Sequence, residues 1–115
     1  MDFDLQARGF TLTPALAAAA RQEARALARL AGDRFLRLQV RLFDVNGRKG
    51  GVDKGCLVAA RLGRLRRVAV ATSIDSDLYR AIPAAFDKLR RAIAGASDRQ
   101  QARRRRRGPP TPLPA

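Results

Sequence analysis

Hydrophobic residues recur along this chain with two different periods, and the order of those periods restricts the fold more than any single motif does. Apolar and polar residues alternate from Phe3 to Arg8 and again from Leu36 to Phe43, which is the period of a strand with one buried face. Two further apolar segments with β-branched residues, Cys56–Leu62 and Arg66–Thr72, are separated by a turn signal at Gly63. These four segments are predicted to be strands.

A helical period separates the first two strands. Thr13 is a favourable N-cap and Pro14 suits the first helical position, while Gly32 ends the helix. The stripe expected to be buried consists of Leu16, Ala20, Leu27, Leu30 and Ala31. Arginines spaced four residues apart follow the opposite side, so this helix is predicted to bury one face and to present guanidinium groups on another.

The last helix has the clearest apolar stripe in the chain. Its members recur every three or four residues and are Leu78, Ile82, Phe86, Leu89 and Ile93. Ser76 or Asp77 is expected to cap this helix, and Gly95 is expected to end it. Pro83 removes one backbone hydrogen bond inside this segment, so it predicts a kink or a helix that begins there.

Residues 96–115 contain the arginine run Arg103–Arg107, followed by a Pro-rich end. This composition is typical of disorder, so residues 1–95 are predicted to form the domain and residues 96–115 a disordered Arg/Pro-rich basic tail. The remaining order of strand, helix, three strands and helix predicts an α+β, βαβββα domain, in which two helices pack on one face of a four-stranded sheet. The other face of the sheet stays open.

The charge and composition of the chain exclude several classes of function. It has 24 Lys and Arg against 10 Asp and Glu, a formal net charge of +14, no histidine and one cysteine, Cys56. Without histidine, and with a single thiol expected in the core, no catalytic, metal or cofactor site is predicted. The loop Gly47–Gly51 lacks the Lys-Ser/Thr ending of a phosphate loop, which argues against an NTPase.

A nucleic acid is the partner that this charge favours. Only three of the 24 basic residues are lysines, and the guanidinium groups of the others bind phosphate bidentately and stack on bases. Few aromatic residues are present, so recognition of phosphate groups and of shape is predicted rather than base stacking on the sheet. The longest apolar run, Ala15–Ala20, is far shorter than the roughly 20 residues of a membrane span, so a cytoplasmic protein without a membrane partner is expected.

Four segments of the chain resemble the short hibernation-promoting factors, also called ribosome-associated inhibitor A or σ-54 modulation proteins. The segments are Arg8–Leu16, Val40–Gly47, Gly50–Cys56, and Asp77–Ile82 with its continuation to Asp87–Leu89. The last two are the most specific, and the resemblance extends from residue 3 to about residue 93. The sequence departs from the family at Pro83, where the family usually has Asp, and in its basic, Pro-rich end.

The resemblance implies a fold similar to that of double-stranded RNA-binding domains and binding to the small ribosomal subunit, between its head and body. There the protein would occupy the channel of mRNA and of the A-site and P-site tRNAs and inhibit translation by idle ribosomes, without a reaction or a small-molecule substrate. The second domain of the long, self-dimerising form is absent from this sequence, so a monomer off the ribosome is expected. The resemblance assigns rRNA contact to Arg8, Lys88 and Arg91, and the charge pattern adds Arg21, Arg25, Arg29, Arg48, Lys49, Lys54 and Arg80.

Several alternatives stay open on the sequence. The run Arg103–Arg107 suits a general RNA or DNA chaperone, or a solubilising tail with no binding role. Tyr79 matches a family tyrosine and suits either core packing or rRNA contact, whereas Asp75 and Asp77 suit helix capping better than contact. Because the basic tail differs from the acidic tail of the inhibitor branch, both promotion and prevention of ribosome pairing stay open.

Overall fold

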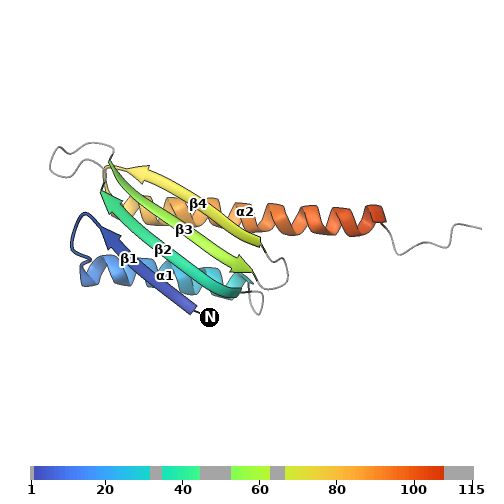
Figure 1. Cartoon of the computed structure of the whole chain (residues 1–115), viewed down its shortest axis with the longest axis horizontal. Coiled ribbons are helices and arrows are strands. Elements are labelled where there is room, and N and C mark those ends of the chain that lie inside the picture. The colour runs from blue at the N-terminus through green and yellow to red at the C-terminus, as the bar shows by residue number, and fades with distance from the viewer. Residues whose placement is uncertain (1, 32–34, 45–52, 63–66, 108–115) are drawn as a thin grey trace, which may run out of the picture.

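The computed structural model describes residues 2–31, 35–44, 53–62 and 67–107. These residues form β1 (Asp2–Arg8), α1 (Pro14–Ala31), β2 (Phe35–Asp44), β3 (Lys54–Leu62), β4 (Arg67–Asp75) and α2 (Leu78–Arg107). Their order along the chain is the predicted order of strand, helix, three strands and helix (Figure 1). None of the described helices is long and apolar enough to cross a membrane.

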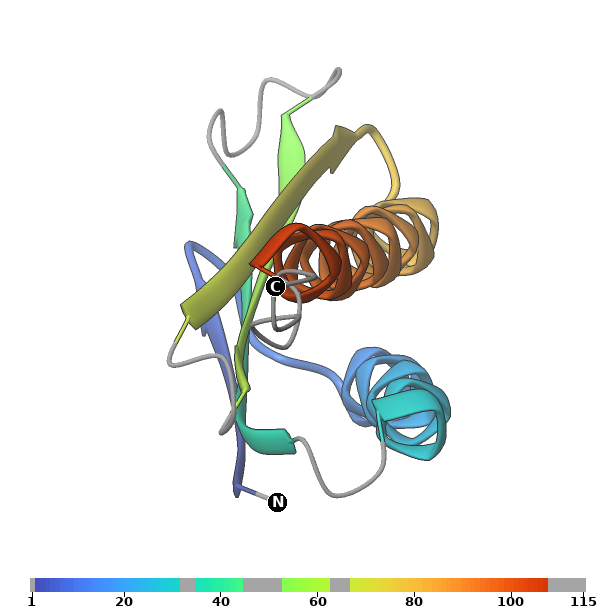
Figure 2. The same ribbon diagram turned by 90° about the vertical axis from the view of Figure 1, so that its right-hand side faces the viewer.

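The described strands form a mixed sheet in the order β1-β2-β3-β4. β1 and β2 are parallel, since α1 returns the chain to the end of the sheet where β1 begins, whereas β2, β3 and β4 are consecutive antiparallel neighbours. Both helices lie on the same side of the sheet, α1 against β2 and α2 against β3 and β4 (Figure 2). The α+β, βαβββα architecture is therefore confirmed, and no described element covers the opposite face, called here the open face.

α1 begins as its sequence predicts. The Thr13 hydroxyl accepts a hydrogen bond from the Leu16 backbone N–H at 3.2 Å, and the Thr13 carbonyl accepts one from the Ala17 N–H at 3.0 Å. Leu27 is buried as expected, but Leu30 is 66% exposed, so its assignment to the buried stripe is wrong. Leu30 lies about 60° around the helix from Leu27, which takes it to the edge of the stripe, beyond the reach of the sheet.

Gly9 makes the turn that leads out of β1. Its φ of 89° is in the left-handed region, which glycine adopts without strain. A Cβ on Gly9 would also lie 3.2 Å from the Asp44 carbonyl oxygen, so the turn passes close to the end of β2. The turn therefore holds the end of β1, and with it Arg8, beside the end of β2.

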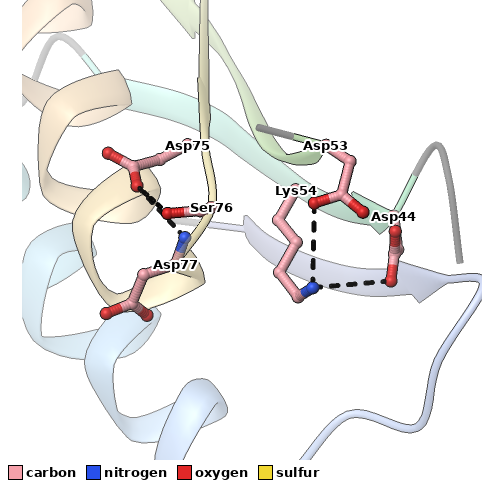
Figure 3. Close-up of polar contacts among 6 residues, drawn as sticks. All are labelled: Asp44, Asp53, Lys54, Asp75, Ser76 and Asp77. Atoms are coloured by element: carbon pink, nitrogen blue, oxygen red, sulfur yellow. Dashed lines mark hydrogen bonds and ion pairs between the residues drawn. The ribbon is translucent and has the colours of Figure 1, made fainter. Parts of the chain in front are cut away.

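α2 starts at Leu78 through a carboxylate cap. The Tyr79 backbone N–H donates to Asp77 Oδ1 at 2.9 Å. The Asp77 N–H in turn donates to Asp75 Oδ1 at 3.1 Å (Figure 3). Both aspartates therefore act in capping, as predicted. Pro83 lies inside the helix, so the alternative in which α2 begins at Pro83 is wrong.

The end of α2 differs from the sequence prediction. The helix continues through Gly95 to Arg107, so the predictions that it ends at Gly95 and that residues 96–107 are disordered are wrong. A glycine costs about 1 kcal/mol relative to Ala inside a helix, and the Arg, Gln and Ala residues that follow are good helix formers that offset this cost. The division of the chain into a domain and a tail at residue 95 stays a prediction, and residues 108–115 lie outside the described residues.

The core lies between the sheet and the two helices. Leu38, Val40 and Leu42 of β2 are completely buried, as are Val58 of β3 and Phe86 of α2. Phe86 is the largest of the fully buried side chains, and it comes from the centre of the predicted α2 stripe. The strand residues that alternate with these buried ones face the open side of the sheet.

Candidate nucleic-acid interface

The arginines of α1 form one exposed row. Arg21, Arg25 and Arg29 are all exposed, while Leu27 on the other side of the helix is buried. Glu23 of α1 forms an ion pair at 2.8 Å with Arg90 of α2, and Arg90 also binds Asp87 at 2.7 Å.

Glu23 marks the side of α1 that faces α2. It lies about 160° around the helix from Arg25. The α1 arginine row therefore faces away from α2 and does not merge with the basic residues of that helix.

The basic residues of α2 separate into two positions. Arg80 and Arg91 are exposed and lie within about 20° of each other around the helix, away from the buried stripe. The Arg80 Nε lies 3.7 Å from Asp77 Oδ2, a loose pair between exposed groups. Lys88 instead donates a hydrogen bond from Nζ to the Thr72 carbonyl of β4 at 3.0 Å, so its ammonium group lies beside the sheet.

Lys54 is held between two carboxylates. Its Nζ lies 3.8 Å from Asp53 Oδ1 and 3.8 Å from Asp44 Oδ2 (Figure 3). The Asp53 side chain is fully buried, and its oxygens accept no hydrogen bond from the described residues. A buried carboxylate without hydrogen bonds is costly unless a cation compensates its charge, and Lys54 does so here. We therefore leave Lys54 out of the proposed interface.

Arg8 lies on the open face, on the far side of the sheet from both helices. It is exposed at the end of β1, and its register partner on β2 is Phe43. Arg41, two residues before Phe43, is exposed on the same face. Arg48 and Lys49 lie outside the described residues.

Phe43 is a residue that the sequence prediction did not use. The alternation in β2 already placed it on the polar side of the strand, and the structure puts it half-buried on the open face. Its neighbour across the sheet, Gly55 of β3, becomes visible only with the strand register. Base stacking on the sheet was not expected from the sequence, and Phe43 places one aromatic ring beside the arginines of the open face.

The described residues of this surface offer mainly cations. Among the described residues no group of three or more His, Cys, Asp or Glu side chains could hold a metal ion. The surface instead presents exposed guanidinium groups on α1, on α2 and on the open face, which are suited to bind phosphate.

Comparison with known families identifies the chain. The family model described as sigma 54 modulation protein / S30EA ribosomal protein matches residues 3–101. The chain belongs to this S30EA family. The match continues beyond residue 95 into the part of α2 that the sequence had assigned to a tail.

Solved structures share the fold of this S30EA family member. The N-terminal domain of Protein Y from Thermus thermophilus is 26% identical, with a TM-score of 0.63 over 77% of this chain and 91% of that one. A ribosomal subunit interface protein from Coxiella burnetii is 14% identical, with a TM-score of 0.64 over 85% of this chain and 99% of that one, and it supports the fold alone. None of the curated proteins compared with the chain matches it.

Tyr79, the residue that matches a family tyrosine, is 52% exposed on the first turn of α2. It does not belong to the core, so of the two alternatives left open by the sequence, core packing is wrong. Contact with a partner stays a prediction for this member of the S30EA family.

Cys56 of this S30EA protein is completely buried in β3, which confirms the prediction of a packed core thiol. Burial raises the pKa of the Cys56 thiol from 9.0 to about 12, because the thiolate would lose its hydration.

We expect iodoacetamide at pH 8 to leave the folded chain unmodified and to alkylate it rapidly in urea, as measured by mass spectrometry. Rapid labelling of the folded chain would contradict this.

The same pKa predicts how stability depends on pH. Between pH 9 and about pH 12 the unfolded chain has lost the Cys56 proton and the folded chain retains it, so stability falls as pH rises through this window. The slope from this group is at most about 1.4 kcal/mol per pH unit. In urea unfolding, the free energy of unfolding should therefore decrease more from pH 8 to pH 10 for the wild type than for Cys56→Ala, which lacks the titrating group.

Proposed function

We propose that this protein is a ribosome hibernation factor that acts by occupancy and not by catalysis. It binds rRNA of the small ribosomal subunit in the channel used by mRNA and tRNA, and it thereby inhibits translation by idle ribosomes in the cytoplasm. The residues proposed to contact rRNA are Arg8, Arg21, Arg25, Arg29, Arg80, Lys88 and Arg91, together with Arg48 and Lys49 on sequence grounds.

The observation that carries the proposal is the family match over residues 3–101, combined with the directions in which the basic residues point. The α1 row faces away from α2, the Arg80 and Arg91 side chains lie opposite the α2 stripe, and Arg8 lies on the open face. A protein that lies on one RNA duplex needs one basic surface. A protein enclosed by rRNA contacts phosphate groups on several sides, which is the arrangement that this chain offers.

The family supports the same partner, since the matched family is described as an S30EA ribosomal protein. With a net charge of +14, the chain should bind rRNA mainly through phosphate contacts, each of which releases counterions. The logarithm of the affinity should therefore fall linearly with the logarithm of the salt concentration, and each phosphate contact should add roughly one unit to the slope.

Cosedimentation and translation in a purified system test the proposal together. The protein is expected to pellet with small subunits at low salt, to be released as salt rises, and to stop translation when added in excess before mRNA and initiator tRNA. Adding mRNA and tRNA first should protect the ribosomes, since both occupy the same channel. Translation at full rate in the presence of a large excess of the protein, whatever the order of addition, would refute the proposal.

A further inference from the structure

A hollow of about 480 Å³ lies on the sheet where β1 and β2 end. Its lining consists of Gln6, Ala7, Arg8, Arg41, Leu42, Phe43, Asp44 and Leu57. Ala7 and Leu42 pack in or against the core, so they contribute backbone, while the side chains on the open face form the walls. The volume falls within the range of about 300–1,000 Å³ that is usual for small-ligand sites.

An aromatic ring forms one wall of this hollow. Phe43 is paired with Gly55 of β3, and a Cβ on Gly55 would lie 2.2 Å from the Phe43 Cζ and 2.3 Å from its Cε2. The ring therefore lies across bare backbone, in space that any other residue at position 55 would fill. Strand alternation puts Phe43 on the open face beside the arginines, and the absence of a side chain at Gly55 lets the ring lie against the sheet.

The other walls carry charge and hydrogen-bonding groups. Arg8 and Arg41 are exposed, and neither pairs with an acidic side chain among the described residues. The Gln6 amide donates to Asp4 Oδ2 at 3.3 Å, which leaves its carbonyl oxygen to accept a hydrogen bond from a ligand. Leu57, in register with Arg41, adds apolar surface on the β3 side.

We propose that this hollow binds one unpaired nucleotide of an RNA strand. The base packs against the Phe43 ring and Leu57, and the adjoining phosphate lies between the guanidinium groups of Arg8 and Arg41. The inference rests on the proposed function for the origin of the nucleotide, which is an unpaired position in rRNA. It goes further in naming a base contact, whereas the proposed function needs phosphate contacts alone.

The combination of groups argues for an unpaired nucleotide and against other anions. A phosphate or carboxylate alone would use the two arginines and leave the aromatic and apolar walls in water. A base-paired nucleotide hides its faces in the helical stack, so only an unstacked base presents a face to a ring. Stacking on an aromatic side chain is also tolerant of base identity, so no sequence preference is required.

Binding of a single-stranded uridine dodecamer tests the site. Phe43→Leu keeps the apolar volume but removes the ring, and it is expected to weaken binding about fivefold in fluorescence anisotropy. Gly55→Ala places a methyl group where the ring lies, and it should weaken binding to a similar extent without altering a wall residue. A dodecamer that carries 5-iodouridine should crosslink to Phe43 of the wild type, as located by mass spectrometry.

A matched pair of arginine variants separates the site from general attraction. Arg41 and Arg37 lie on the same strand and the same face, both are exposed, and only Arg41 lines the hollow. Arg41→Gln is expected to weaken dodecamer binding about tenfold, because it removes a charged contact, while Arg37→Gln with the same loss of charge weakens it about twofold. Circular dichroism and thermal unfolding establish that each variant is folded.

Each outcome supports or overturns the proposal. Equal losses for Arg41→Gln and Arg37→Gln, together with an unchanged affinity of Phe43→Leu, would overturn it. Uridine monophosphate that displaces the dodecamer with an affinity equal to that of the RNA would also overturn it, since the hollow would then be a site for free nucleotides.

Cosedimentation of the same variants distinguishes this proposal from the proposed function. A wild type that pellets with small subunits, with no effect of the hollow variants in either assay, refutes the hollow alone. A Phe43 crosslink and weakened variants, without any binding to small subunits, refute the ribosomal function alone.

Discussion

Neutralising five of the arginines that are exposed on α1 and on the first part of α2 is expected to weaken binding to the small ribosomal subunit by at least about a hundredfold near physiological salt, since up to five phosphate contacts are lost. The variant carries Gln at Arg21, Arg25, Arg29, Arg80 and Arg91. None of these side chains is buried, and the firm ion pair between the helices uses Arg90, which is unchanged. The fold should therefore be retained, and the slope of log affinity against log salt should become shallower by up to about five units.

A control with the same change of charge is available in the chain. Replacing Arg103–Arg107 with five glutamines also lowers the net charge from +14 to +9, as 14 − 5 = 9. If the proposed interface is correct, this second variant should keep most of its affinity for small subunits and lose mainly non-specific RNA binding. Affinity for small subunits is measured by cosedimentation at two salt concentrations. A larger loss in the Arg103–Arg107 variant than in the helix-surface variant would favour the general chaperone and contradict the proposed interface.

The second large effect concerns stability. Phe86→Ala is expected to lower the free energy of unfolding by about 3–5 kcal/mol, because it removes the largest fully buried side chain and leaves a cavity between α2 and the sheet. This loss is a large part of the roughly 5–15 kcal/mol that stabilises a domain. The melting temperature should fall by roughly 15 °C or more, as measured by circular dichroism.

Tyr79→Ala provides the comparison for Phe86→Ala. Tyr79 lies on the same helix and has a ring of similar size, but it is 52% exposed while Phe86 is 0% exposed. Its replacement is expected to cost about 1 kcal/mol or less, as for other surface positions. Equal destabilisation by the two substitutions would contradict the packing described here.

Much of the fold could be predicted because its signals are local. Thr13 sets the start of α1, and Asp77 sets the start of α2, through hydrogen bonds to residues within one turn. Pro14 adds a backbone angle that suits the first helical position. Strand alternation likewise divides buried from open residues without knowledge of the partner strand. Leu30 was assigned wrongly because it lies at the edge of the apolar stripe, where the pattern is weak. The end of α2 was placed wrongly at Gly95 because the neighbouring residues offset the helix-destabilising effect of this glycine.

The candidate site could be predicted only as a set of basic residues. The sequence places Lys54 among the rRNA contacts, since it cannot reveal that Asp44 and Asp53 each form an ion pair with its ammonium group. It also gives no sign that Lys88 reaches the Thr72 carbonyl, 16 positions earlier in the chain. The ion pairs of Lys54 and the hydrogen bond of Lys88 both depend on which strands and helices are neighbours.

The sequence by itself determined the order of the elements, the starts of both helices and the excess of positive charge, because each depends on residues close together in the chain. The tertiary structure alone decided the directions of the three basic surfaces and the placement of Phe43 over Gly55. These follow from the register of β2 with β3 and from the packing of α1 against α2. Register and packing are set by the burial of a shared core between segments far apart in the chain, and no local pattern encodes that choice.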